Sequence, residues 1–523
     1  MKKDLSSNLF TNLITLEMAN NHMGDFQHGK LMIDEFAKIV SPYKEHFQFA
    51  WKFQFRDIPS FIHPDYKDRM DIKYVKRFTE TNLTENEFKQ LKEHAISKGF
   101  ITMCTAFDEN SVDKMLRIGF DIAKVASCSS TDWPLLEKLV NIDLPIIIST
   151  AGTSLEDVDN IVSFFQHKGQ RDNINRNFAI MHCVGEYPTK LKNLQLNQID
   201  LFKNRYEDVK IGFSTHEHPE DSQAVKLAVA KGVDMFEKHV AVDTEEYPKN
   251  GYSATPEDVD LWLKSMLEAY QMCGVKTGRH KFSDKEIGDL RQFRRGMFAK
   301  KEIEAGEAIN SDNVFYAWPN QSNQLLSIDM SKFTEYIATE NFGINDPIFS
   351  SKVSAVDKRT GLWNIVNDVK SLLKKSGVVF PGKADLEISH HYGIENFYKT
   401  GLTMITVVNR EYCKKLLISL PGQNHPEQYH KKKEETFVVL YGDVQLKLDG
   451  HLTVLEKGDI VTVESEVRHE FTTKTGCVIE EVSSTHYIND SFYTDNAIAA
   501  NKNRKTHLTQ WTGWDLLKTN SAQ

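Results

Sequence analysis

Residues 209–239 read VKIGFSTHEHPEDSQAVKLAVAKGVDMFEKH and contain one strand–helix–strand unit. An apolar run at 209–216 ends in polar residues, a stretch with helical spacing follows at 218–231, and a second short apolar run ends at His239. Short buried strands that alternate with helices are typical of parallel sheets. The polar side chains that end each run can bind a ligand or take part in catalysis, so the strand ends are candidate functional sites.

Six further apolar runs precede this unit, and each carries or ends at a polar side chain. They are NLITLEM (12–18), FQFAWKFQF (47–55), FITMCT (100–105), DIAKVAS (121–127), LPIIIST (144–150) and FAIMHC (178–183). Helical spacing recurs between runs, at 84–98, 154–167 and 256–272. Eight such units predict a (β/α)8 barrel, in which the C-terminal strand ends meet at one mouth. We therefore expect these polar residues to surround a single site.

Composition bounds the possible partners and location. The chain has 523 residues and a net charge of −9, so we expect more than one domain and no nucleic-acid partner. No apolar stretch approaches the roughly 20 residues that a membrane span needs, and we expect no membrane association and no signal peptide. The six cysteines form no CxxC pair. Reduced thiols and a cytoplasmic location are expected.

The pattern changes several times after the barrel. A polar segment at 274–292 follows it, and a compact segment with short strands and glycine turns follows that segment. An amphipathic helix and then period-two alternation with hairpin signals come next. We predict a barrel (1–280), a small β-rich capping domain (293–353), a linker helix (354–379), an all-β domain (380–497) and an unassigned tail (498–523).

The barrel strand ends carry two kinds of charged or coordinating group. His216 and His239 end neighbouring strands, where two imidazoles can share one divalent cation, although each could instead be a structural hydrogen-bonding residue. Lys52 and Lys124 also lie at strand ends, where a lysine is costly unless it meets an anion or extends to solvent. Hydroxyl groups on the same rim come from Thr105, Ser127, Ser149 and Ser214. The set suits a small substrate with phosphate and carboxylate groups.

Eight motifs in order resemble the sialic acid synthase family, which condenses phosphoenolpyruvate with an amino-sugar aldehyde. They are LEMANNHMGD, WKFQFRD, CTAFD, AKVAS, PIIISTAGTS, MHCVGEYPT, IGFSTHE and FEKHVAVD. The stretch RRGMFAKKEIEAGEAINSDNV at 294–314 is similar to the antifreeze-like domain that closes this family. The resemblance covers about residues 1–353. It implies a domain-swapped homodimer, a surface-polysaccharide role, and phosphoenolpyruvate and an aldose as substrates.

The same resemblance assigns roles to individual residues. It implies that His216 and His239 are ligands of a divalent metal, Mn²⁺, and that Glu17 is a catalytic carboxylate near the ion. Gln54 and Tyr187 are implied as sugar contacts. The implied phosphoenolpyruvate pocket consists of Lys52, Thr105, Lys124, Ser127, Ser149 and Ser214.

Departures from the family pattern fall on positions that contact the acceptor sugar. Ser129 stands where a glutamate is usual, Gly185 where an asparagine is expected, and Trp318 where the capping domain has an arginine. The aspartate expected before the SxxP motif is replaced by Lys249 or Asn250. The reaction type is therefore predicted, and N-acetylmannosamine is not predicted as the acceptor.

The C-terminal domain has a second motif. Gly422, Gln428, His430, Glu435 and Gly442 fit G-x5-H-x-H-x4-E-x6-G, with glutamine in the first histidine position, and His469 ends the second half of the pattern. This resembles the cupin superfamily, a jelly-roll barrel. The stretch PGQNHPEQYHKKKEETF at 421–437 is similar to cupin sugar isomerases of the D-lyxose isomerase type. The implied metal ligands are Gln428, His430, Glu435 and His469, for Mn²⁺, Fe²⁺ or Zn²⁺.

Several functions remain open at this point. The leading hypothesis is a phosphoenolpyruvate-dependent sugar-acid synthase whose cupin binds metal and isomerises or senses a sugar. A bifunctional isomerase–synthase, in which the cupin makes the acceptor, is one alternative. A non-catalytic sugar-sensing protein and a different metal-dependent barrel enzyme, an aldolase or hydrolase, are the others.

Overall fold

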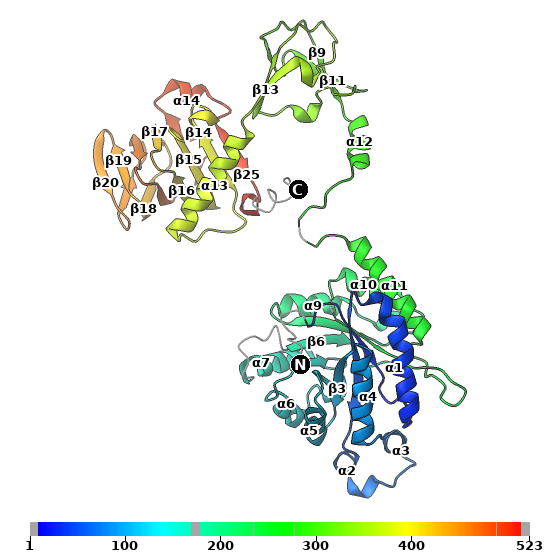
Figure 1. Cartoon of the computed structure of the whole chain (residues 1–523). Coiled ribbons are helices and arrows are strands. Elements are labelled where there is room, and N and C mark those ends of the chain that lie inside the picture. The colour runs from blue at the N-terminus through cyan, green and yellow to red at the C-terminus, as the bar shows by residue number, and fades with distance from the viewer. Residues whose placement is uncertain (1–8, 169–177, 234, 277, 488, 514–523) are drawn as a thin grey trace. The chain divides into compact units, whose positions relative to one another are not determined.

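The computed structural model describes residues 9–168, 178–233, 235–276, 278–487 and 489–513. The chain divides into two compact units, residues 1–276 and residues 277–523, and each is described here by itself (Figure 1). No helix in the described part of the chain is long and apolar enough to cross a membrane.

The first unit is a closed barrel of eight parallel strands in sequential order, as predicted. The strand after the last helical crossover pairs with the first strand, so that His239 lies opposite Glu17. The strands are β1 (Leu13–Glu17), β2 (Gln48–Phe55), β3 (Ile101–Ala106), β4 (Ile122–Val125), β5 (Ile146–Ser149), β6 (Phe178–Cys183), β7 (Lys210–Thr215) and β8 (Met235–His239).

Helices surround the barrel, and several begin at side-chain caps. Thr84 and Thr255 each form a reciprocal capping box that starts the following helix, which satisfies N–H groups that lack an intrahelical partner. The helical stretches predicted at 84–98, 154–167 and 256–272 are confirmed, and the helix predicted at 218–231 begins later, at Gln223. The helices are α1 (Phe26–Val40), α2 (Ile58–Phe61), α3 (Lys73–Glu80), α4 (Glu85–Ser97), α5 (Glu109–Ile118), α6 (Trp133–Leu139), α7 (Leu155–Lys168), α9 (Asn197–Arg205), α10 (Gln223–Ala230) and α11 (Pro256–Cys273).

The barrel interior is apolar at one end and polar at the other. An apolar cluster at the starts of the strands includes Leu13, Met103, Ile122, Ile147 and Met235. Because side chains alternate along a strand, the next inward positions lie above this floor, toward the C-terminal ends. The polar residues at the strand ends therefore form a buried polar cluster above a hydrocarbon floor, and this cluster is called the chamber from here on.

The second unit begins with α12 (Asp284–Gln292) and a small β-rich module that has its own apolar core. In it β9 (Gly296–Ala299) pairs with β11 (Val314–Ala317), and β10 (Ala308–Ile309), β12 (Thr334–Ala338) and β13 (Val353–Asp357) form a second sheet. The predicted linker helix starts later than expected. Residues 354–357 belong to β13, and α13 (Arg359–Ser376) follows.

The all-β domain consists of two antiparallel sheets, as expected for a jelly roll. The apolar face of α13, which includes Ile365, Val366 and Val369, packs against the larger sheet (Figure 1). The strands are β14 (Leu386–His390), β15 (Gly401–Asn409), β16 (Tyr412–Ser419), β17 (Asn424–Tyr429), β18 (Glu435–Tyr441), β19 (Val444–Leu448), β20 (His451–Leu455), β21 (Ile460–Val463), β22 (His469–Thr472), β23 (Cys477–Ser484), β24 (Phe492–Tyr493) and β25 (Lys505–Leu508).

The domain boundary expected at residue 497 is wrong, because the larger sheet continues beyond it. After α14 (Asn496–Ala500), β25 pairs antiparallel with β14 at the edge of the larger sheet. Trp511 is fully buried in the core between α13 and this sheet, and its indole N–H donates to the carbonyl of Ala384 at 2.9 Å. Residues 498–513 are thus part of the β domain, and the rest of the predicted tail lies outside the described residues.

Candidate functional site

The polar chamber of the barrel is organised around a buried carboxylate, that of Glu237 on β8. Lys52 Nζ lies 2.7 Å from one oxygen of Glu237 and also pairs with Glu17. Lys124 Nζ lies 3.6 Å from the other oxygen and donates to Ser149 Oγ at 2.5 Å. Four strands therefore bring two ammonium groups and two carboxylates together in the barrel interior.

Glu237 is not among the residues to which the sequence assigned a role. The signal that identifies it is the alternation along β8, because residues 237 and 239 share the face that points into the barrel. The intervening Lys238 points the other way and pairs with buried Glu217 at 2.9 Å. That pair supports the wall of the barrel and lies outside the chamber.

Burial and mutual attraction set the charges in the chamber. Burial lowers the pKa of Lys52 to about 7, against the attraction of Glu237. Burial acts to raise the pKa of Glu237, but Lys124 and Lys52 outweigh it and hold this pKa well below its usual range. Near neutral pH the chamber therefore contains a firmly ionised carboxylate beside a lysine that is poised to lose its proton.

The two histidines lie side by side, with ring centroids 5.3 Å apart. His216 Nδ1 donates to the carbonyl of Val184 at 2.8 Å, which leaves Nε2 with its lone pair. His239 Nδ1 is buried and has no hydrogen-bond partner among the described residues. Burial lowers the pKa of His216 to about 4 and that of His239 well below its usual value, so both rings are neutral. Neutral imidazoles with free nitrogens fit a shared divalent cation.

Hydroxyl groups complete the predicted rim. Ser214 Oγ donates to Glu237 at 3.2 Å, and Thr105 Oγ1 is buried without a hydrogen-bond partner in the described part of the chain. Ser127 Oγ accepts the N–H of Ala151 at 3.0 Å. Together with Ser149, these side chains offer donors around the two lysines. A phosphate or carboxylate oxygen would satisfy the unpaired hydroxyl of Thr105.

The two predicted sugar contacts lie at the outer edge of the chamber. Tyr187, half exposed, follows β6, and its ring lies 4.3 Å from the ring of His216. Gln54 lies on β2, two residues beyond Lys52 on the same face, and accepts a hydrogen bond from Arg56 at 3.3 Å. Both positions are compatible with contact to a substrate that enters the barrel mouth.

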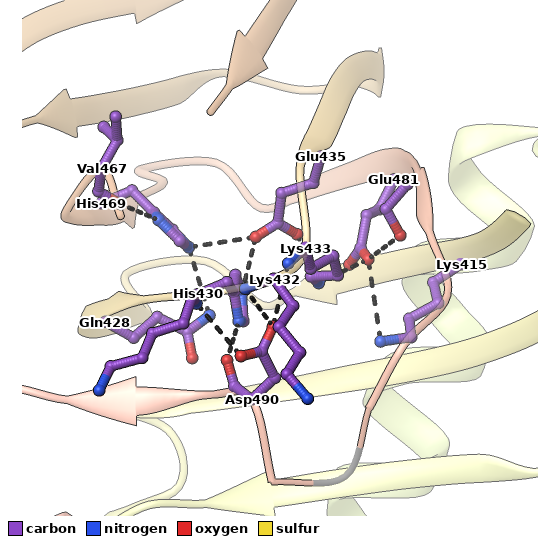
Figure 2. A network of polar contacts seen from close by, with 12 residues as sticks. Lys415, Gln428, His430, Lys432, Lys433, Glu435, Val467, His469, Glu481 and Asp490 are labelled. Atoms are coloured by element: carbon purple, nitrogen blue, oxygen red, sulfur yellow. Dashed lines mark hydrogen bonds and ion pairs between the residues drawn. The ribbon is translucent and has the colours of Figure 1, made fainter. Parts of the chain in front are cut away.

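The predicted cupin ligands converge in the β domain (Figure 2). His430 Nε2 lies 2.8 Å and His469 Nε2 lies 3.4 Å from Oε1 of Glu435. Gln428 Nε2 lies 3.4 Å from His469 Nε2, and Gln428 Oε1 is buried without a hydrogen-bond partner among the described residues. Three buried groups converge on one point, beside an unpaired amide oxygen, and this donor set fits a divalent transition metal.

Backbone carbonyls orient both cupin histidines. His430 Nδ1 donates to the carbonyl of Asp490 at 2.5 Å, and His469 Nδ1 donates to that of Val467 at 3.1 Å. Each bond fixes the tautomer and leaves Nε2 directed at Glu435, as outer hydrogen bonds do in metal sites.

Lys433 is a site residue that the sequence did not reveal. Lys431 and Lys432, which precede it, are exposed. Lys433 is instead buried, and its Nζ lies 2.8 Å from Glu435 Oε2 and 2.9 Å from Glu481 Oε1. The Asp490 carboxylate accepts hydrogen bonds from the backbone N–H groups of all three lysines, and these bonds hold the loop in place.

Comparison with known proteins agrees with both parts of this description. The NeuB family model matches residues 49–278, and a cupin domain model matches residues 416–479. A solved structure of a putative spore coat polysaccharide biosynthesis protein E from Chromobacterium violaceum is 41% identical, covers 66% of this chain and 99% of its own, and superposes with a TM-score of 0.62.

Several of the curated relatives are named synthases, among them the following two. N,N'-diacetyllegionaminic acid synthase of Campylobacter jejuni is 24% identical over 335 residues, which are 63% of this chain and 96% of that protein. N-acetylneuraminate-9-phosphate synthase of Drosophila melanogaster is 30% identical over 241 residues, which are 45% of this chain and 61% of that protein.

The fold and the chamber define a (β/α)8-barrel enzyme joined to a second, all-β module with its own cluster of metal-ligating side chains. The barrel contains a NeuB family domain, and the second unit contains a cupin domain.

Proposed function

We propose that the barrel condenses phosphoenolpyruvate with an aldose to give a 3-deoxy-2-keto sugar acid and inorganic phosphate. The observation that carries the proposal is the pair of buried ammonium groups, Lys52 and Lys124, held in one chamber with two neutral imidazoles. Such a chamber binds a small, multiply charged anion at one end and a polarisable oxygen at the other. The names of the curated synthase relatives support the same reaction class.

The chain's own residues have distinct tasks in this reaction. Lys52 and Lys124 bind the phosphate and carboxylate of phosphoenolpyruvate, and Glu237 balances their charge when the chamber is free. His216 and His239 would hold a divalent cation, Mn²⁺ by resemblance, which would supply Lewis-acid polarisation of the aldose carbonyl.

The bonding changes then follow in order. The enol carbon C3 forms a bond to the aldehyde carbon, and positive charge develops at C2. The aldehyde oxygen takes up a proton and becomes a hydroxyl group. Water adds at C2, and Glu17 is placed to take one of its protons. The C2 hydroxyl then loses its remaining proton as the C2–O bond to phosphate breaks, which leaves a ketone at C2 and free inorganic phosphate. The two lysines stabilise the departing phosphate. Much of the rate comes from holding both substrates in one orientation.

Phosphate release with phosphoenolpyruvate and a panel of aldoses tests this function, together with the mass of the product. Wild-type protein should release phosphate in an aldose-dependent manner, and His216→Ala should not. His218→Ala is a matched control, because His218 is exposed two residues away. Phosphate release that does not depend on an aldose would refute the synthase proposal and favour a different barrel enzyme. The absence of phosphate release with every aldose would also refute it and would favour a sugar sensor.

For the cupin we propose a divalent cation, Mn²⁺, Fe²⁺ or Zn²⁺, held by His430, Glu435, His469 and Gln428. The support is the convergence of three buried ligands and the unpaired oxygen of Gln428. A small pocket, with a cavity volume of about 40 Å³, adjoins these residues. For the cupin domain we propose one of two roles, isomerisation of an aldose or simple sugar sensing. Interconversion of aldoses and ketoses by the full chain, measured without phosphoenolpyruvate, distinguishes them.

The likeness of residues 293–353 to the antifreeze-like domain leads us to infer a homodimer in which this module closes the partner's barrel. The molar mass of the full chain by light scattering tests dimerisation.

A further inference from the structure

The interior of the β domain contains a lysine whose ammonium group is not fully paired. Lys415 lies on β16 and shares its inward face with Leu417, which belongs to the apolar core between the two sheets. The side chain of Lys415 is only 4% exposed. The nearest carboxylate oxygen in the described part of the chain, Oε1 of Glu481, lies 3.8 Å away, which is beyond hydrogen-bond distance. A buried ammonium group is costly unless it meets an anion.

The carboxylate of Glu481 is already occupied by other donors. Lys433 donates to its Oε1 atom at 2.9 Å, and the hydroxyl of Ser483 donates to the same atom at 3.0 Å. Figure 2 shows the ammonium end of Lys415 beside Glu481. An ammonium group has three N–H donors. Lys415 is therefore the member of this network with donors left for a ligand.

The charges of the network balance only while no metal is bound. Two buried ammonium groups, those of Lys415 and Lys433, accompany two buried carboxylates, those of Glu435 and Glu481. The divalent cation that we propose at the cupin would add two positive charges, and neutral imidazole and amide ligands would offset neither. The loaded site would thus carry a surplus of positive charge in a buried position. An anionic ligand would offset this surplus.

A further cation lies in the wall of the same pocket. Arg504 lines the pocket together with Lys415. The guanidinium carbon of Arg504 lies 5.0 Å from the ring centroid of Tyr493, and no carboxylate of the described residues forms an ion pair with it. Lys505 also lines the pocket, but its ammonium group lies 2.6 Å from Glu387. The surplus of positive charge therefore extends along the pocket wall.

The size of the cavity limits what can enter it. Its volume of about 40 Å³ has room for about three water-sized groups. A whole sugar ring is too large for this volume, whereas the two carboxylate oxygens and the adjacent oxo oxygen of a 2-keto acid match it. Carboxylate and carbonyl oxygens are also suitable ligands for a divalent cation. The cavity and its charges together favour an acidic head group over a neutral sugar.

We propose that the cupin binds the 2-keto carboxylate end of the sugar acid that the barrel makes, with the carboxylate at Lys415 and beside the metal. The inference rests on the proposed function, because it takes both the metal and the acid from it. The rest of the acid extends toward Arg504, whose side chain is partly exposed. The cupin is then a binding site for the product of the barrel.

Binding at the cupin can be measured separately from binding at the barrel. The full chain with His216→Ala lacks a ligand of the proposed barrel site, so Co²⁺ added to it reports on the cupin through its visible absorption bands. The probes are 2-keto-3-deoxygluconate, which is a 3-deoxy-2-keto sugar acid, and fructose, which is a neutral ketose. Phosphoenolpyruvate and inorganic phosphate are the other anions. We expect the keto acid to change the spectrum at concentrations about 10- to 100-fold lower than fructose does, the range for a hydrogen bond to a charged group. Phosphoenolpyruvate and phosphate should bind more weakly than the keto acid.

Variants in the His216→Ala protein test the role of the lysine. Lys415→Met keeps an unbranched stem and should weaken binding of the keto acid by about tenfold. It should not weaken binding of Co²⁺, which a collapse of the pocket would do. Lys415→Arg keeps the charge and should retain most of the affinity. Lys414→Met is the matched control and should bind the acid normally, because Lys414 points to the opposite face of β16 and pairs with Glu480.

Equal affinity for the keto acid and fructose would overturn the proposal, as would tighter binding of phosphate or phosphoenolpyruvate than of the keto acid. An unchanged affinity in Lys415→Met would also overturn it. If the His216→Ala protein binds no Co²⁺, the cupin metal site and this proposal fail together. The measurement needs no turnover, so it does not depend on the outcome of the phosphate-release assay. If that assay refutes the synthase, selective binding of the keto acid that Lys415→Met removes would still establish the site.

Discussion

The ammonium group of Lys433 lies 2.8 Å from Oε2 of Glu435, the carboxylate oxygen turned away from the two cupin histidines. The other oxygen, Oε1, faces His430 and His469. One lysine thus fixes which oxygen of Glu435 is presented to a metal, and Glu481 on β23 holds that lysine from the far side.

Lys433→Met should weaken metal binding at the cupin by about 10- to 100-fold, the usual effect of losing an outer hydrogen-bond partner. The reason is that Glu435 loses the contact that orients it. Titration of metal into metal-free protein measures the affinity. Lys432→Met is the control, because its side chain is exposed one residue away, and it should bind metal normally. Equal affinities for the two variants would show that Lys433 does not position the ligand.

The two metal sites should empty independently. His216→Ala should lower bound metal by one ion per chain and abolish condensation, whereas His430→Ala should lower it by one ion and leave condensation unchanged. The reason is that the barrel and cupin ligands lie in separate compact units. Elemental analysis with a phosphate-release assay checks both. Unchanged metal content in either variant would contradict that site's assignment.

Condensation should decline as the pH rises above neutrality. Since burial lowers the pKa of Lys52 to about 7, this side chain is charged below that pH and loses its positive charge above it. We expect kcat/KM for phosphoenolpyruvate to fall toward tenfold per pH unit on the alkaline side. Lys52→Arg, which stays charged, should show a flatter profile even if its rate is lower. A wild-type profile that stays level to pH 9 would argue against this role of Lys52.

Trp511→Ala should destabilise the β domain by about 3–5 kcal/mol, because it leaves a cavity in the core under α13. Denaturant unfolding followed by circular dichroism should show an earlier transition for this domain. The exposed Trp318 gives a comparison, and Trp318→Ala should change stability by less than about 1 kcal/mol. If Trp511→Ala unfolds at the wild-type midpoint, residues 498–513 do not stabilise the domain.

The barrel could be predicted because its strands are buried on both faces and therefore appear as continuous apolar runs. The inward direction of His216, His239, Lys52 and Lys124 followed from their positions at strand ends. The proximity of His430, Glu435 and His469 followed from their spacing in the motif. These features are local in the sequence, and local patterns are what a single sequence reports.

The remaining features depend on contacts between distant residues. Lys433 is buried because Glu481, from a later strand, approaches it, and nothing in KKKEE distinguishes this lysine from its neighbours. The edge strand β25 has only Thr506 fully buried, so it lacks the alternation that marks a strand.

The pairing of β25 with β14 bears on the order in which the protein can fold during translation. The barrel's segments emerge from the ribosome first, and domains generally fold as units in that order. The edge of β14 instead stays uncovered until the whole of the intervening jelly roll has been synthesised, and an uncovered strand edge can pair with another chain. Nascent β domains are therefore the species in which we expect co-translational aggregation or chaperone dependence.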